Sequence, residues 1–161
     1  MSEISDRKKD HVKLTIDERA QYVQTTGFEK YQFVHNALPE INLDEVSTEA
    51  VLLGRTFSFP LFISSMTGGY SDAGQVNAII AEFCEHQNLP FGVGSQRAML
   101  EDASLTETFS IVRKKAPTTF ICSNIGGAQL IGNLDIDKAR KMIESIEANA
   151  VIIHLNPLQE L

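Results

Sequence analysis

The sequence lacks several features that would place a protein in a familiar functional class. It has no apolar run near the ~18 residues of a transmembrane helix, and its charged start has no apolar signal core behind it. Its two cysteines, Cys84 and Cys122, stand far apart in apolar segments and form no C-x-x-C pair. We therefore expect a cytoplasmic protein with two buried free thiols and no thiol-bound zinc.

An excess of positive charge is also missing. The chain has 14 Lys and Arg against 21 Asp and Glu, a formal net charge of −7, which argues against general affinity for nucleic acid. Neither G-x-x-x-x-G-K nor G-x-G-x-x-G occurs, so the sequence predicts neither a triphosphate loop nor a dinucleotide fingerprint. An anionic ligand would therefore need a local cluster of cations.

Residues 1–57 are polar and irregular, and they predict an N-terminal extension with a mixed helical stretch around Ile16 to Gln24. Residues 58–161 are different, because short apolar runs recur there at a regular spacing. Runs of this kind are typical of buried strands. The four predicted strands are Phe59–Ser64, Phe91–Val93, Thr119–Ser123 and Ala150–Leu155.

Three amphipathic segments separate the apolar runs and predict helices. The first runs from Ser71-Asp72 to Gln87-Asn88, the second covers Ser104 to Lys115, and the third starts at Asp135 or Asp137. Apolar residues at helical spacing define the faces expected to point inward. These are Val76, Ile79, Ile80 and Phe83, then Leu105, Phe109 and Val112, then Ile136, Ala139, Ile143 and Ile146.

Regular alternation of strand and helix predicts an α/β fold with a parallel sheet, either an open doubly wound sheet or a barrel. A (β/α)8 TIM barrel needs eight such units, whereas about four strands and three helices are present here. The last strand, with Val151 to Ile153, has no helix after it to cover its apolar side chains. This exposed edge suggests an incomplete chain, with residues 58–161 as the first half of a barrel.

Each predicted strand ends in a polar, mostly glycine-rich motif, and ligands of parallel α/β proteins bind at these carboxyl ends. Turning a corner requires glycine and small polar residues, but it does not require arginine, histidine, glutamine and glutamate at one rim. The set therefore predicts a ligand site. The motifs are SMTGG at 65–69, GSQRA at 94–98, NIGGAQ at 124–129 and HLNPLQE at 154–160.

Single residues in these motifs are ambiguous. Arg97 has the planar donor fork that suits phosphate oxygens, although an exposed salt bridge is the alternative. Glu160 suits Mg²⁺, which takes one or two carboxylates together with water and phosphate oxygens, but a surface glutamate is the alternative. His154 is either an acid or base or a hydrogen-bonded core residue. The basic cluster Arg7 to His11 either binds a diphosphate or is simply solvated.

Taken together, the strings RKKDH at 7–11, SMTGG, GSQRA, NIGGAQ and HLNPLQE resemble the type 2 isopentenyl diphosphate isomerases, in that family's order. The resemblance covers the whole chain. Members of that family are about twice this long, so the chain resembles their N-terminal half. The missing half would supply a lysine near the flavin and the loops that hold the FMN phosphate.

This resemblance implies an FMN-binding TIM barrel that interconverts isopentenyl and dimethylallyl diphosphates and requires reduced FMN, NADPH or NADH, and Mg²⁺. It also implies a homo-oligomer. Flavin contacts would come from Ser65, Met66, Thr67, Ser95 and Asn124. The diphosphate substrate would be bound by Arg7, Lys8, His11, Ser95, Gln96 and Arg97, together with Asn156. Gln159 would lie beside the reacting carbons, and Glu160 would bind the metal.

Moving a double bond requires one proton to be added and another to be removed. Gln159 and Asn156 cannot titrate and Glu160 would be occupied by metal, so His154 is the one suitable side chain among them. This shortage favours the reduced flavin as the proton-transfer group, with Gln159 and His154 positioning or relaying. Two alternatives stay open. One is another FMN-dependent oxidoreductase with a TIM barrel, and the other is an inactive truncated fragment.

Overall fold

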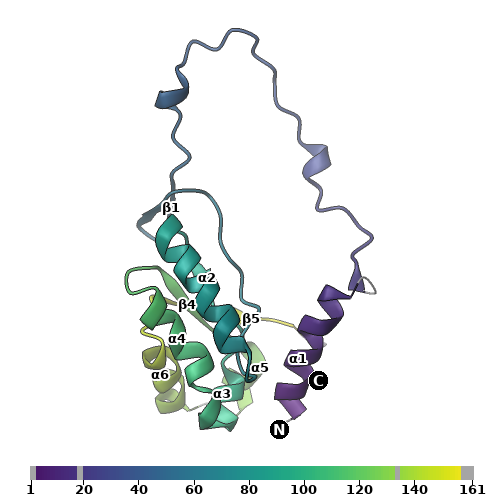
Figure 1. Ribbon diagram of the computed structural model, residues 1–161, viewed down its shortest axis with the longest axis vertical. Coiled ribbons are helices and arrows are strands. Elements are labelled where there is room, and N and C mark those ends of the chain that lie inside the picture. Colours follow the sequence, from purple (N-terminus) through teal and green to yellow (C-terminus); the bar gives the residue numbers. More distant parts are fainter. Residues whose placement is uncertain (1–2, 18–19, 133–134, 157–161) are drawn as a thin grey trace.

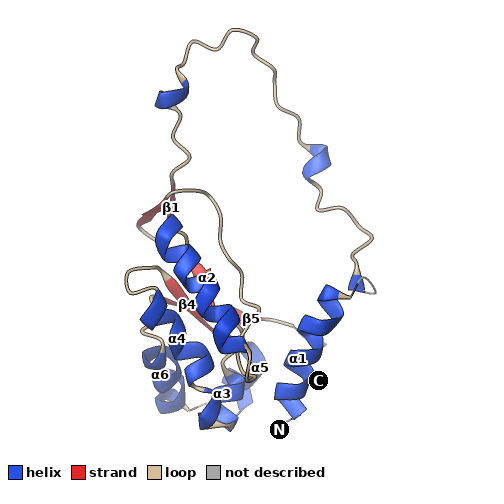
Figure 2. Cartoon of the chain, viewed as in Figure 1, coloured by secondary structure: helices blue, strands red, loops and turns tan. Residues whose placement is uncertain are grey.

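The computed structural model describes residues 3–17, 20–132 and 135–156. Figure 1 shows an α/β body, a separate N-terminal helix α1 (Glu3–Ile16), and a long connection between them that arches away from both. Among its described residues, this connection carries single turns of 3-10 helix at Phe28–Lys30 and Leu43–Glu45. Figure 2 shows that strands occupy only the body, where helices lie against them.

The body is built on a parallel sheet of three strands in the order β3 (Phe91–Gly92), β4 (Ile121–Gly126) and β5 (Ala150–His154). Every residue of the central strand β4 is buried, as expected for a strand with neighbours on both sides and both faces covered. In β5, partly buried and exposed residues alternate, so one face of this strand is open. The predicted parallel arrangement and three of the four predicted strands are confirmed within a few residues.

The fourth predicted strand, Phe59–Ser64, is wrong as a continuous element. It contributes a single parallel bridge, between Ile63 and Phe91, and the Gly92 N–H donates to the Ile63 carbonyl at 2.9 Å. Pro60 lies inside the segment, lacks an N–H and therefore cannot extend a ladder of hydrogen bonds. The segment still runs beside β3, so its end reaches the same edge of the sheet.

The predicted TIM barrel is also wrong, because the described residues form two small open sheets. The second sheet is an antiparallel hairpin of β1 (Ala50–Leu52) and β2 (Arg55–Phe57). It lies against the start of β4, where the rings of Phe57 and Phe120 meet edge to face at 6.0 Å. The architecture of the described residues is therefore mixed α/β, with the parallel sheet as its centre.

Helices α2 (Ala73–Gln87) and α4 (Glu107–Lys115) pack against each other on the sheet, and α6 (Ile136–Ser145) lies beside them (Figure 1). All three predicted helices are confirmed. Two short helices, α3 (Arg97–Glu101) and α5 (Gly127–Gly132), were not predicted, and the predicted helix Ser104 to Lys115 is divided into the 3-10 turn Ala103–Leu105 and α4. Each of the two short α-helices begins within or directly after a strand-end motif.

The predicted inward face is correct for α4 and only partly correct for α2, where Val76 and Ile80 are half-buried. Phe109 and Val112 are fully buried, whereas Ile79 and Phe83 of α2 are exposed. The buried residues of α2 are Ala73, Asn77, Ala81 and Cys84. Small side chains on this face allow α2 to approach α4 closely, and this close packing outweighs the burial of the larger apolar residues. In α6, Ile136 is exposed and Met142 is buried, neither as predicted, whereas Ile146 at its end is buried as predicted.

Both cysteines are free and buried, as predicted, and burial raises the pKa of each thiol to about 11. Within the described ranges, none of the helices combines the length and the hydrophobicity that crossing a bilayer requires. The helical stretch expected around Ile16 to Gln24 is wrong. The helix of this region is α1, which ends at Ile16.

Candidate functional site

A cavity of about 900 Å³ lies where α1 meets the carboxyl ends of the strands. Its lining residues come from five separate parts of the chain: α1, the Phe59–Ser64 run with the residues directly after it, the loop after β3, strand β4, and strand β5 with the residues directly after it. They are Arg7, Lys8, His11, Phe62, Ser64, Ser65, Met66, Ser95, Asn124, Ile152, His154 and Asn156. The structure thus brings most of the predicted site residues into one place.

The parallel sheet explains this convergence. Asn124 pairs with Ile152, and Gly126 pairs with His154, so the polar ends of β4 and β5 are in register. Gln96 extends the pattern, because its N–H donates to the Asn124 carbonyl at 2.9 Å and so joins the loop after β3 to β4. Parallel strands place their carboxyl ends at one edge, which is why motifs far apart in sequence line one cavity.

The basic wall of the cavity comes from α1. Arg7 and His11 stand four residues apart and therefore lie on the same side of this helix. Lys8 extends from α1 to the rim, where its Nζ donates to the Gly68 carbonyl at 2.8 Å and to the Ser95 carbonyl at 2.6 Å. Burial, and after it the charge of Arg7, lower the pKa of Lys8 to about 8.

The other elements add apolar side chains to the lining. Phe62, Met66 and Ile152 present apolar groups, and Met66 is 70% exposed although its side chain is hydrophobic. The Ser65 hydroxyl oxygen is buried without a hydrogen-bond partner in the part of the chain that the structure describes. A buried polar atom of this kind is a place where a ligand can complete the hydrogen bonding.

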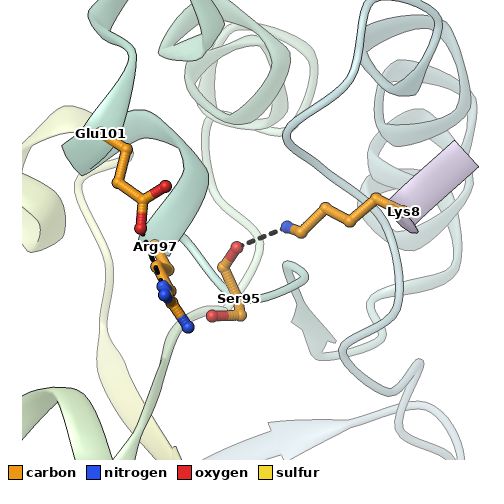
Figure 3. Close-up of polar contacts among 4 residues, drawn as sticks. All are labelled: Lys8, Ser95, Arg97 and Glu101. Atoms are coloured by element: carbon orange, nitrogen blue, oxygen red, sulfur yellow. Dashed lines mark hydrogen bonds and ion pairs between the residues drawn. The ribbon is translucent and has the colours of Figure 1, made fainter. Parts of the chain in front are cut away.

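Three predicted residues do not line the cavity. The Thr67 hydroxyl donates to Asn77 Oδ1, which secures the SMTGG loop to α2. Arg97 instead forms an ion pair with Glu101, Nε to Oε1 at 2.8 Å, one turn along α3 (Figure 3). This pair matches the salt-bridge alternative for Arg97.

Gln96 is the third, and its side chain is completely buried. Its amide nitrogen donates to the Met142 carbonyl at 3.0 Å, and its amide oxygen accepts a hydrogen bond from the Ser123 hydroxyl at 2.5 Å. These bonds connect α6 and β4 to the GSQRA loop. Direct contact of Thr67, Gln96 or Arg97 with a ligand therefore stays a prediction. Gln159 and Glu160 lie outside the described residues.

Sequence reasoning missed three lining residues, Phe62, Ser64 and Ile152. Ile152 could have been found, because it lies two residues before His154 on a strand, and residues two apart share a face. It also missed that the basic cluster belongs to a helix. The charged and apolar residues of α1 give only a weak amphipathic pattern, so the periodicity of this segment is a poor signal.

No protein-family model matches the chain. It is, however, similar to several proteins named isopentenyl-diphosphate delta-isomerase. It is 48% identical to that of Chlorobium phaeovibrioides over 158 residues, which cover 98% of this chain and 44% of the relative. The relative from a Nostoc species is 42% identical, and the match covers 96% of this chain and 44% of the relative. The relative from Archaeoglobus fulgidus is 43% identical, and the match covers 97% of this chain and 45% of the relative.

The chain therefore spans less than half the length of the curated relatives it matches. These comparisons correct the narrower resemblance, to the N-terminal half of an FMN-dependent type 2 enzyme. The names of the relatives state the isomerase activity, with neither a type nor a flavin. What the comparisons establish is similarity, along almost the whole of this chain, to proteins named isopentenyl-diphosphate delta-isomerase.

Proposed function

We propose that this chain provides the diphosphate-binding side of an isopentenyl-diphosphate delta-isomerase, an enzyme of isoprenoid biosynthesis. The observation that supports this function best is that cationic and apolar side chains line the same cavity. Arg7, Lys8 and His11 gather on one wall, and apolar side chains lie elsewhere in the same cavity. Isopentenyl and dimethylallyl diphosphates have the matching chemistry, because each joins a diphosphate to a short hydrocarbon tail. Cations suit the first part and apolar groups suit the second.

The proposed roles follow from this division. Arg7 and His11 bind the diphosphate, and the apolar residues Phe62 and Ile152 pack against the hydrocarbon. Isomerisation adds a proton to one carbon and removes a proton from another, so it requires groups that give and accept protons. His154 is a titratable side chain of the cavity and can exchange a proton, and Asn156 beside it can orient the substrate. Gln159 keeps its proposed place near the reacting carbons.

FMN is the proposed cofactor, and the chemistry of several lining residues supports it. Ser65 has a buried hydroxyl oxygen that lacks a partner among the described residues, and the exposed Met66 side chain beside it offers an apolar surface for a flat ring. Ser95 and Asn124 add polar groups at the strand ends. When bound and reduced by NADPH or NADH, FMN would supply proton-transfer chemistry.

Magnesium is the proposed metal ion. Among the described residues, no group of three or more His, Cys, Asp or Glu side chains is arranged to hold a metal ion. The proposal rests on Glu160, and Mg²⁺ commonly needs only one or two carboxylates when substrate phosphates and water complete its coordination.

The proposed function is tested by measuring isopentenyl diphosphate binding with calorimetry and product formation with proton NMR, in the presence of FMN, NADPH and Mg²⁺. Arg7→Met is expected to weaken binding by about tenfold or more, because it removes a charge-assisted contact to phosphate. Lys9→Met is the matched control, since Lys9 is exposed on the same helix and does not line the cavity.

Absence of binding by the unaltered chain would contradict the proposal, and so would equal effects of the two substitutions. The NADPH balance separates an isomerase from the oxidoreductase alternative. An isomerase forms much more product than the NADPH it consumes, whereas an oxidoreductase consumes NADPH in step with product. Binding without turnover would favour the inactive alternative.

A further inference from the structure

Lys8 occupies a position that substrate binding alone does not explain. We infer that Lys8 is a latch, a positioning residue whose ammonium fastens α1 to two strand-end loops and thereby holds Arg7 and His11 at the cavity. The inference rests on the proposed function for the purpose of the latch. The attachment of α1 is a separate property that can be measured without substrate.

The geometry of Lys8 joins three parts of the chain. Its Nζ donates to the carbonyl of Gly68 in the SMTGG loop and to the carbonyl of Ser95 in the GSQRA loop, while its own backbone belongs to α1. Figure 3 shows the side chain reaching across to Ser95. An ammonium has three N–H donors, so two of the three are committed to backbone carbonyls. The Nζ also lies 5.3 Å from the centre of the Phe109 ring, within the range of a cation–π contact.

The loop leaves room for this side chain. Gly69 has a φ of +85°, in the left-handed region that favours glycine, and an added Cβ would lie 3.0 Å from Lys8 Nζ. The same Cβ would lie 2.5 Å from the Ala98 Cβ. A larger residue at position 69 would therefore displace Lys8 or the start of α3, and glycine avoids both clashes.

The remainder of α1 is weakly attached. No described residue of α1 belongs to either buried core cluster, and its apolar side chains Leu14 and Ile16 are exposed. Among the α1 side chains that the structure describes, those of residues 6–16, Lys8 donates the two hydrogen bonds seen to other parts of the chain. Loss of this ammonium should therefore release the basic wall of the cavity while the α/β body stays folded.

If the only role of Lys8 were to bind phosphate, its removal would give a different result. Its loss would weaken ligand binding but would leave the position of α1 in the ligand-free protein unchanged. The attachment of α1 without ligand is thus the property that separates the two roles.

Hydrogen exchange followed by mass spectrometry measures this attachment on the full 161-residue chain without ligand. We expect α1 amides to exchange about tenfold faster or more in Lys8→Met than in the unaltered chain, and amides of α2 and α4 to be unchanged. Lys9→Met, which removes the same charge from the same helix, should leave α1 exchange unaltered. Lys8→Gln keeps a neutral donor and should give a smaller increase.

Calorimetry with inorganic pyrophosphate completes the test. Arg7→Met and Lys8→Met should both weaken binding, but only Lys8→Met should also speed α1 exchange. Unchanged α1 exchange in Lys8→Met would overturn the latch, as would α1 amides that are already unprotected in the unaltered chain. If the unaltered chain does not bind pyrophosphate, the proposed function fails, and the exchange result still decides whether the latch exists.

Discussion

At the scale of single residues, the cavity depends on a glycine that has no polar group to offer a ligand. An added Cβ at Gly92 would collide with the Ser65 hydroxyl oxygen and would lie 3.2 Å from both Ile152 Cδ1 and Phe62 Cζ. All three of these side chains line the cavity. Because Gly92 has no side chain, the end of β3 can lie close to these three lining residues.

We predict that Gly92→Ala lowers the free energy of unfolding by about 1–3 kcal/mol, because the extra methyl group forces packed neighbours apart. Urea unfolding followed by circular dichroism measures this change. Gly74→Ala is the matched control, since a Cβ at that helical position would approach nothing closer than Thr108 Cα at 3.6 Å. That substitution should stabilise the protein by up to about 1 kcal/mol. A Gly92→Ala protein as stable as the unaltered chain would contradict the packing argument.

At the scale of elements, Arg113 connects the end of α4 to the strands that carry the site. Its guanidinium donates to the carbonyls of Ala116, Pro117 and Thr119 before β4, and to Glu147 O and Asn149 Oδ1 before β5. The Asn149 side chain also accepts a hydrogen bond from the Ile121 N–H of β4 at 2.9 Å. One side chain thus fixes the spacing between the starts of two neighbouring strands.

Arg113→Lys should therefore lower the free energy of unfolding by about 2–3 kcal/mol, because an ammonium has fewer donors and no planar fork to reach these acceptors together. Thermal and urea unfolding test this expectation. Lys114→Met provides the comparison on the same turn. Lys114 makes an exposed ion pair with Glu107 at 3.3 Å, so its loss should change stability by less than about 0.5 kcal/mol. If both substitutions lowered the free energy of unfolding equally, Arg113 would be an ordinary surface cation.

The elements also show which parts of the structure could be predicted from the sequence. Strands β3 to β5 and helices α2, α4 and α6 were predicted because hydrophobic pattern and capping residues agree there, as at Asp135, whose side chain accepts from the Lys138 N–H. The buried face of α2 could not be predicted, since small residues such as Ala81 gain from close packing that hydrophobicity alone does not register. Among residues 6–16 of α1 none is fully buried, so hydrophobic periodicity gives little sign of where this helix lies, and the contacts of Lys8 are visible only in the structure.

The candidate site was predictable in a similar, partial way. The strand-end motifs correctly placed Ser65, Ser95 and Asn124 at one cavity, because parallel strands end at a common edge. The inward turn of Gln96 was not predictable, since a polar side chain in a glycine-rich loop gives no sign that it is fully buried. Only the tertiary structure supplies its partners on β4 and α6.

At the scale of the whole molecule, strand β5 forms an open edge of the parallel sheet. It pairs with β4 on one side, and the described residues provide no strand on the other. The side chains of Val151 and Ile153, two residues apart on one face, are 41% and 53% exposed. Unpaired backbone groups beside exposed apolar side chains favour pairing with another chain.

We therefore predict that the protein self-associates through β5, and the family resemblance likewise implies a homo-oligomer. Ile153→Lys should weaken association by about tenfold or more, because a charge would be placed in the apolar contact. Sedimentation velocity over a range of concentrations measures this effect. Ile79→Lys supplies the control, since Ile79 is equally apolar and 68% exposed but lies on helix α2 rather than at the sheet edge. A chain that stays monomeric at every concentration would contradict this prediction. Equal weakening of association in both variants would also contradict it, because exposed apolar side chains would then act alike wherever they lie.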